Sequence, residues 1–232
     1  MRRRGPALML ATALLGACAP PPATAVPAAV VVTLGDSVPA GNACGCRPFP
    51  DLYARHLGAR SVNLAAGGAT TTDVARLLDT PTAQSAVRQA STVLIMVGAN
   101  DAAQAFPGGA PAAYRTIAGD VQSQVTAMVR RLHDLDGGQV RVLVLGYWNV
   151  VEDGAVARTD YDAAETAEAT EATTVLNEHL AAAARASWAT YVSTRAALKG
   201  ADGSADPTGL LAADGDHPNA QGHAAIAAAL PG

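Results

Sequence analysis

The sequence predicts an α/β fold, a three-layer α/β/α sandwich around a central, mainly parallel sheet of five strands. Short apolar runs rich in valine, leucine and isoleucine alternate with longer stretches of helical period, which is the pattern of repeated β-α units. The runs are almost continuously apolar, as expected for strands that helices cover on both faces. The chain has 232 residues, 50% of them hydrophobic, and contains no internal repeat, so we expect one folded domain.

The start of the chain has the pattern of an export signal. Three arginines at positions 2–4 precede an apolar run, residues 7–15, that is too short to span a bilayer as a mature helix. The run leads into Leu-Gly-Ala-Cys18, which resembles the bacterial lipobox. This resemblance makes Cys18 the lipid-bearing first residue of the mature protein.

Two positions for the signal-peptidase cut remain open. Lipobox processing gives a signal peptide over 1–17, a Pro- and Ala-rich tether over 18–28 and a folded domain over 29–232. The alternative is an ordinary cut after the A-x-A site that ends at Ala25, which discards Cys18. In both cases we expect export, either to the outer face of the cell membrane as a lipoprotein or as a secreted protein.

The elements of the domain follow from the same periodicities in chain order. Glycine directly follows the first, third and fourth apolar runs and ends them. Strands are expected at 29–34, 61–64, 92–97, 140–145 and 190–193. The stretches between them have helical period, and a proline introduces the last one. Helices are expected at 49–56, 72–78, 112–133, 161–188 and 218–230.

Composition excludes several classes of partner. A net charge of -4 with only 16% charged residues provides no basic stripe, so we expect no nucleic-acid partner. Aromatic residues make up 4% of the chain, too few for a long platform on which sugars or bases stack. We expect a monomer that contacts the membrane only through its N-terminal lipid anchor.

The first candidate site follows the first predicted strand, at Gly35-Asp36-Ser37 and the residues up to Gly41. Open α/β sheets bind ligands at this carboxyl edge. Gly35 permits a sharp turn and Pro39 suits the first turn of a helix, so Ser37 is expected near a helix N-terminus, where backbone amides favour developing negative charge. The alternative is a turn whose residues only cap a helix.

The second candidate site is the pair Asp214 and His217, in a glycine-containing loop that ends at Pro218. A carboxylate three residues before a histidine can fold back onto the ring Nδ1, which leaves Nε2 free to act as a base. Pairs of Asp and His also bind metals, but no further ligands with recognisable spacing accompany this one. We therefore predict neither a metal nor an organic cofactor.

Two further polar loops follow the second and third predicted strands, at 63–70 and 98–101. They present glycine N–H groups and the side-chain amide of Asn100 at the same edge of the sheet. Such donors stabilise the oxyanion of a tetrahedral intermediate. Each loop alone is equally compatible with a tight turn, but four polar loops at strand ends on one side of the sheet indicate a common site.

The four motifs together resemble the SGNH, or GDSL-type, esterase and lipase family. They occur in the family's order, as Gly-Asp-Ser at 35–37, the glycine block at 63–70, Gly-x-Asn-Asp at 98–101 and Asp-x-x-His at 214–217. The resemblance covers most of residues 30–230. It implies the flavodoxin-like α/β/α fold of that family.

The resemblance also implies a catalytic triad. Ser37 is the expected nucleophile, His217 the general base and then acid, and Asp214 the residue that orients His217. The implied reaction is acyl transfer in two halves, in which Ser37 attacks an ester carbonyl and water later releases the acid from the acyl-enzyme. The implied substrate is a small ester or an acylated component of the cell envelope.

An oxyanion hole follows from the matching positions. The family pattern implies three donors, the backbone N–H of Ser37, the N–H of Gly68 and the side-chain amide of Asn100. Gly68 is preferred to Gly67 because the family's glycine directly precedes a small residue and a threonine, as Gly68 does here.

Apart from Cys18, the chain has two cysteines, Cys44 and Cys46. In a chain bound for an oxidising compartment we expect them to form a disulfide on the loop after the nucleophile. Zinc is not expected there, because a structural zinc site needs about four ligands and no second cysteine pair exists.

The sequence departs from the family pattern after the fourth predicted strand. Many relatives continue into a Pro-containing loop, whereas this chain continues into Tyr147, Trp148 and an acid-rich insertion that extends to Thr173. Trp148 or Val150 either lines the acyl pocket or belongs to the core or its rim. Three glutamates spaced three apart in the insertion, Glu165, Glu168 and Glu171, are expected to form a solvated helix face.

Other functions fit parts of the pattern. An α/β-hydrolase would require a Gly-x-Ser-x-Gly elbow, which the sequence lacks. An envelope O-acyltransferase or a polysaccharide deacetylase would use the same triad. A catalytically inactive, lipid-anchored binding protein would keep the fold without the chemistry, and the intact set of motif residues argues against it.

Overall fold

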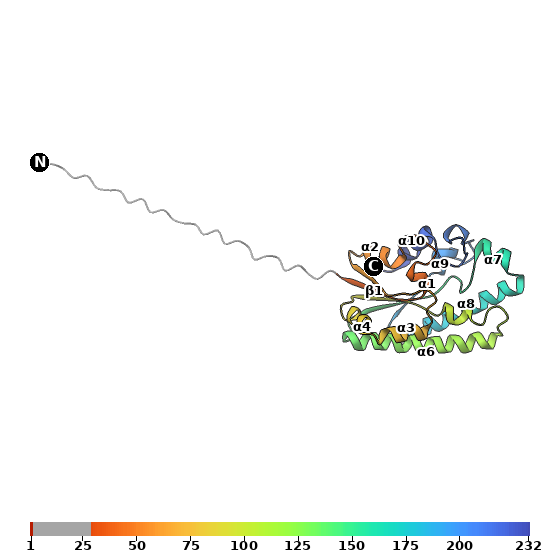
Figure 1. Cartoon of the computed structure of the whole chain (residues 1–232), viewed down its shortest axis with the longest axis horizontal. Coiled ribbons are helices and arrows are strands. Elements are labelled where there is room, and N and C mark those ends of the chain that lie inside the picture. Colours follow the sequence, from red (N-terminus) through yellow and green to blue (C-terminus); the bar gives the residue numbers. More distant parts are fainter. Residues whose placement is uncertain (2–28) are drawn as a thin grey trace.

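Five parallel strands form one sheet in the order β2-β1-β3-β4-β5 (Figure 1). The computed structural model describes Met1 and residues 29–232, so the predicted signal peptide, Cys18 and the tether lie outside the described residues. This strand order is that of flavodoxin-like sheets, and it confirms the predicted α/β sandwich. The strands are β1 (Val30–Gly35), β2 (Arg60–Asn63), β3 (Thr92–Met96), β4 (Arg141–Leu145) and β5 (Thr190–Val192).

Helices cover both faces of the sheet. Figure 1 shows α2, α9 and α10 on one side and α3, α4, α6 and α8 on the other. In the part of the chain that is described, no helix has the length and apolar character needed to cross a membrane. The helices are α1 (Ser37–Ala40), α2 (Phe49–His56), α3 (Thr71–Leu78), α4 (Pro81–Val87), α5 (Ala99–Ala103), α6 (Pro111–Asp136), α7 (Gly154–Asp160), α8 (Ala163–Ala186), α9 (Arg195–Lys199) and α10 (Ala220–Ala229), with a 3-10 turn η1 (Thr208–Leu210).

The central strands explain the continuous apolar runs in the sequence. Every residue of β1 and of β3 is buried, because helices pack on both faces of these strands. The outer strands β2 and β5 are partly exposed. The core therefore lies along β1, β3 and β4, the strands whose carboxyl ends lead into or beside the candidate site.

Sequence and structure agree to within one residue at the strand ends, whereas three helices differ by two or three residues, since α6 ends at Asp136, α8 spans Ala163–Ala186 and α10 begins late. The last helix was expected from residue 218, whereas α10 begins at Ala220. Asn219 is its N-cap, since its side chain accepts the N–H groups of Gln221 and Gly222. Pro218 instead pairs with Leu211 in an isolated antiparallel bridge.

Candidate active site

The loop that carries Ser37 is fixed to the neighbouring strand. β1 ends at Gly35, where a Cβ atom would collide with the backbone carbonyl of Met96 at the end of β3. The next N–H, that of Asp36, donates to the same Met96 carbonyl at 3.1 Å. Ser37 then begins α1, so its backbone N–H points out of the helix N-terminus, as expected from the sequence. Any side chain at position 35 would displace this turn.

Asp36 is a buried anchor of the same loop, with 1% of its surface exposed. Its carboxylate accepts the N–H of Val38 at 3.1 Å, which caps α1, and the hydroxyl of Tyr147 at 2.5 Å. Burial raises the pKa of Asp36 to about 7, although both hydrogen bonds oppose the rise. Nearby charges act as well, since that of Asp216 raises this pKa and that of His217 lowers it.

Tyr147 is a site residue whose role the sequence did not reveal. Its ring is 1% exposed, and its backbone N–H and carbonyl are both held by the side chain of Asn177 on α8, each at 2.8 Å. Its hydroxyl reaches Asp36 across 111 positions of sequence. This contact connects α8 to the loop of Ser37, and only the three-dimensional arrangement shows it.

The buried Asp36 carboxyl makes stability depend on pH. Its folded pKa of about 7 lies above the ordinary value of 3.8, so its stabilising contribution is complete below pH 3.8 and is lost as the pH rises through 7. We expect the free energy of unfolding of the wild type to fall by about 4 kcal/mol, relative to Asp36→Asn, between pH 4 and pH 8. Urea unfolding of both proteins across that range measures the difference.

Tyr147→Phe provides the control for this prediction. The tyrosine hydroxyl holds the pKa of Asp36 down, so its removal moves the loss of stability to higher pH. Parallel pH curves for the wild type and Asp36→Asn would show that Asp36 does not titrate in this range.

Asp214 fixes the orientation of the His217 ring. The ring Nδ1 of His217 lies 2.8 Å from Oδ2 of Asp214, and Oδ1 accepts the backbone N–H groups of His217 and Asp216, each at 3.1 Å. Burial alone would raise the pKa of Asp214, but these hydrogen bonds lower it below its ordinary value. An ionised Asp214 accepts a hydrogen bond from the N–H at Nδ1. The lone pair of the neutral ring is then on Nε2.

The loop of His217 lies close to the loop of Ser37. The charges of His217 and Asp216 both act on Asp36, which directly precedes Ser37. Within the described residues, Nε2 of His217 is buried without a hydrogen-bond partner, and Ser37 Oγ does not donate to it. Catalytic hydrogen bonds often close only when substrate is bound.

The glycine block and Asn100 are joined to each other and to β1, the strand that precedes Ser37. The N–H of Ala66 donates to the carbonyl of Gly35 at 3.0 Å, and the side-chain amide of Asn100 donates to the carbonyl of Ala69 at 3.0 Å. Gly68, between these two anchors, has a φ of 76° and is exposed. Among the described residues, the N–H groups of Gly68 and Ser37 have no protein acceptor, so both are available to an oxyanion.

If Asn100 is an oxyanion-hole donor, as the family resemblance implies, its replacement by alanine is expected to lower kcat by about 100- to 1000-fold, because one preorganised donor is lost. Steady-state hydrolysis of a soluble ester measures the effect, and KM should change little. Gln104→Ala is the matched control, since Gln104 caps the C-terminal end of the same helix and, among the described residues, its side chain bonds only the backbone carbonyl of Asn100. Equal activity of Asn100→Ala and the control would refute the assignment of Asn100 to the oxyanion hole.

Cys44 and Cys46 lie together beside the buried His223. The Cα atoms of the two cysteines are 5.0 Å apart, within the range that a disulfide spans. A ring nitrogen of His223 lies within 4.8 Å of both sulfur atoms. His223 Nδ1 accepts the N–H of Phe49 at 3.2 Å, and burial lowers the pKa of His223 to about 4, so the proton of the neutral ring is on Nε2. A metal ligand needs a lone pair there, so these three residues do not fit a metal site.

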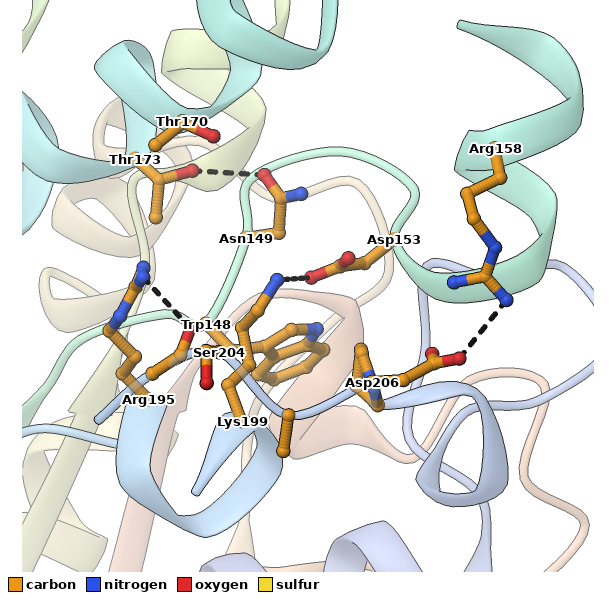
Figure 2. Close-up of a pocket in the computed structure, with 13 residues that line it drawn as sticks. Trp148, Asn149, Asp153, Arg158, Thr170, Thr173, Arg195, Lys199, Ser204 and Asp206 are labelled. Carbon is orange, nitrogen blue, oxygen red and sulfur yellow. Dashed lines mark hydrogen bonds and ion pairs between the residues drawn. The ribbon is translucent and has the colours of Figure 1, made fainter. Parts of the chain in front are cut away.

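The insertion after β4 packs against the core. Trp148 and Val150 are both buried, so they belong to the core, and Trp148 also borders a separate cavity (Figure 2).

The prediction of a solvated glutamate face is wrong for Glu168. Its carboxylate accepts the N–H groups of Gly108 and Gly109 and the hydroxyl of Tyr114, and it therefore fastens the loop before α6 to α8.

Comparison with known proteins extends the resemblance. A model of the GDSL-like lipase/acylhydrolase family matches residues 33–225. The chain is similar to the structure of the lipase Lip_vut3 from a goat rumen metagenome, with 19% identity, a TM-score of 0.72 and coverage of 87% of this chain and 95% of that one. A search of curated proteins found no significant match.

Two further structures are similar. One is phospholipase A1 from Streptomyces albidoflavus NA297, with 19% identity, a TM-score of 0.64 and coverage of 87% of this chain and 98% of that one. The other is a lipase/acylhydrolase from Enterococcus faecalis, with 19% identity, a TM-score of 0.54 and coverage of 87% and 92%. At these identities the likeness demonstrates a shared fold.

Proposed function

Because the chain belongs to the GDSL-like lipase/acylhydrolase family, we propose that it hydrolyses carboxylic esters through a triad of Ser37, His217 and Asp214. The observation that carries the proposal is the 2.8 Å contact between Asp214 and Nδ1 of His217, together with an Nε2 that has no partner among the described residues and lies beside the loop of Ser37. A histidine held in this way has one free lone pair, which is what a general base requires.

In the proposed mechanism, Nε2 of His217 takes the hydroxyl proton of Ser37 as Oγ attacks the ester carbonyl carbon. The carbonyl oxygen becomes an oxyanion that accepts hydrogen bonds from the N–H groups of Ser37 and Gly68 and from the amide of Asn100. Collapse breaks the bond to the alcohol oxygen, which receives the proton from His217. His217 then deprotonates water, which attacks the acyl-enzyme and restores Ser37 as the acid leaves.

A fluorophosphonate probe tests the triad without knowledge of the substrate. We expect the probe to label the wild type at Ser37 and not to label Ser37→Ala. Absence of labelling in the folded wild type would favour an inactive binding protein with the same fold. Labelling at another serine would assign a different nucleophile.

Lipid esters are the first substrates to test, since two of the similar structures are a lipase and a phospholipase A1. Rates should be compared across acyl chain lengths, next to acetylated glycans as the envelope alternative. An added alcohol acceptor separates hydrolysis from transfer, because a transferase passes most of the acyl group to the alcohol, whereas a hydrolase releases it mainly as free acid.

We also propose that the protein is exported and carries a lipid on Cys18, and that Cys44 and Cys46 form a disulfide. The proposal rests on the lipobox-like Leu-Gly-Ala-Cys18 and on the 5.0 Å separation of the Cα atoms of Cys44 and Cys46. Labelled palmitate is expected to enter the wild type and not Cys18→Ala. Labelling of Cys18→Ala would refute the anchor, and two free thiols in non-reducing mass spectrometry would refute the disulfide.

A further inference from the structure

A polar cavity of about 320 Å³ lies between the loop after β4, the helices α7 and α8, and the segment from α9 to η1 (Figure 2). Neither the predicted triad nor the oxyanion-hole residues line it. Three cationic side chains and two carboxylates do, so the lining has an excess of one positive charge. These charged residues are Arg158, Arg195, Lys199, Asp153 and Asp206.

Both carboxylates of this lining already accept hydrogen bonds. Oδ1 of Asp153 accepts the N–H of Gly154 at 2.8 Å, and Oδ2 accepts the ammonium of Lys199 at 2.6 Å. Asp206 accepts the N–H of Thr208 and the guanidinium of Arg158, each at 3.0 Å. Hydrogen bonds from Thr208 and Arg158 lower the pKa of Asp206 to about 2, so it remains an anion at neutral pH.

The donors, in contrast, are in surplus. Within the described residues, Arg195 makes one side-chain hydrogen bond, from Nη2 to the carbonyl of Gly203 at 3.1 Å, and it pairs with no carboxylate. A guanidinium offers five N–H donors. Trp148 is 2% exposed, and its indole N–H has no acceptor in the described part of the chain. Figure 2 shows the indole beneath the contact of Lys199 and Asp153, with its nitrogen turned toward that contact.

We propose that this cavity binds a small anionic ligand through its carboxylate or phosphate group. Arg195 would be the main residue that binds this group. Such a group brings acceptors and negative charge, which are what the lining lacks. A polyol fits less well, because its hydroxyl donors would find the carboxylates already engaged, and a cation fits less well because the lining carries an excess positive charge. The planar guanidinium matches the paired oxygens of carboxylate and phosphate.

The cavity wall is connected to the proposed active site, although the inference does not depend on ester hydrolysis. The N–H of Asp153 donates to the carbonyl of Gly215 at 2.8 Å, in the loop that carries Asp214 and His217. Trp148 directly follows Tyr147, the partner of Asp36. A ligand in the cavity would therefore contact the segment that supports both catalytic loops.

Tryptophan fluorescence offers a direct test, because the chain has two tryptophans and Trp188 is exposed. In Trp188→Phe protein, Trp148 is the only tryptophan, and its emission reports on the cavity. We expect a saturable change in its emission when sodium phosphate or sodium acetate is added at constant ionic strength. The anion that binds more tightly distinguishes a phosphate from a carboxylate ligand.

Two variants in the same background complete the test. Arg195→Gln is expected to weaken anion binding by about tenfold or more, since a charge-assisted hydrogen bond is lost. Arg88→Gln, an exposed arginine after α4, is the control and should bind as before. If Arg195→Gln does not fold, Arg195→Lys, which keeps the charge without the planar fork, is expected to bind more weakly. Absence of a saturable response to either anion, or equal affinity in the folded Arg195 variants, would overturn the proposal.

Discussion

Replacement of Ser37 by alanine is expected to abolish ester hydrolysis, with kcat reduced by about a millionfold, because the reaction loses its nucleophile. The members of a triad act as a unit, so removal of a second one should cost little more. We therefore expect Ser37→Ala and the double variant Ser37→Ala/His217→Ala to have similar residual rates. Single-turnover assays with an activated ester measure these rates.

The fold should be unaffected by Ser37→Ala. Ser37 is half-buried, and its hydroxyl makes no hydrogen bond among the described residues, so its loss leaves no buried group without a partner. Ser85→Ala, at an exposed serine on α4, is the matched control for the substitution. Wild-type activity in correctly folded Ser37→Ala protein would refute the proposed mechanism.

The sequence predicted the sheet because the physics of buried parallel strands is local. The three central runs, at 29–34, 92–97 and 140–145, are apolar and each is followed by a glycine that ends the strand, so their positions are readable without tertiary contacts. The short helices α1, α5 and α9 have four or five residues, too few for a helical period to appear. Their positions are set by caps and by packing.

Part of the candidate site was predictable from the sequence for the same reason. Ser37, Gly68 and Asn100 each follow a strand, and a parallel sheet brings such residues to one edge. The contact between Asp36 and Tyr147 was not predictable, because it joins residues 111 positions apart and Tyr147 otherwise resembles a core residue. The cavity of Figure 2 is similar in this respect, since its lining comes from separate segments between residues 148 and 207.

Replacement of Asp214 by asparagine is expected to reduce kcat by about ten-thousandfold, although the loop should keep its shape. The asparagine Oδ1 can still accept the N–H groups of His217 and Asp216 that the carboxylate accepts now. The amide Nδ2, however, donates a hydrogen bond to Nδ1 of His217, so the ring proton moves to Nε2. The base then has no lone pair for the proton of Ser37.

Asp216 is the matched control, because it is the other carboxylate near the same ring. Its Oδ2 lies 3.7 Å from Nδ1 of His217, beyond hydrogen-bond distance, whereas Asp214 lies at 2.8 Å. We expect Asp216→Asn to change kcat by less than about tenfold, through the loss of a nearby charge alone. An equal loss in the two variants would mean that the whole loop, and not one carboxylate, orients His217. A larger loss in Asp216→Asn would assign the triad acid to Asp216.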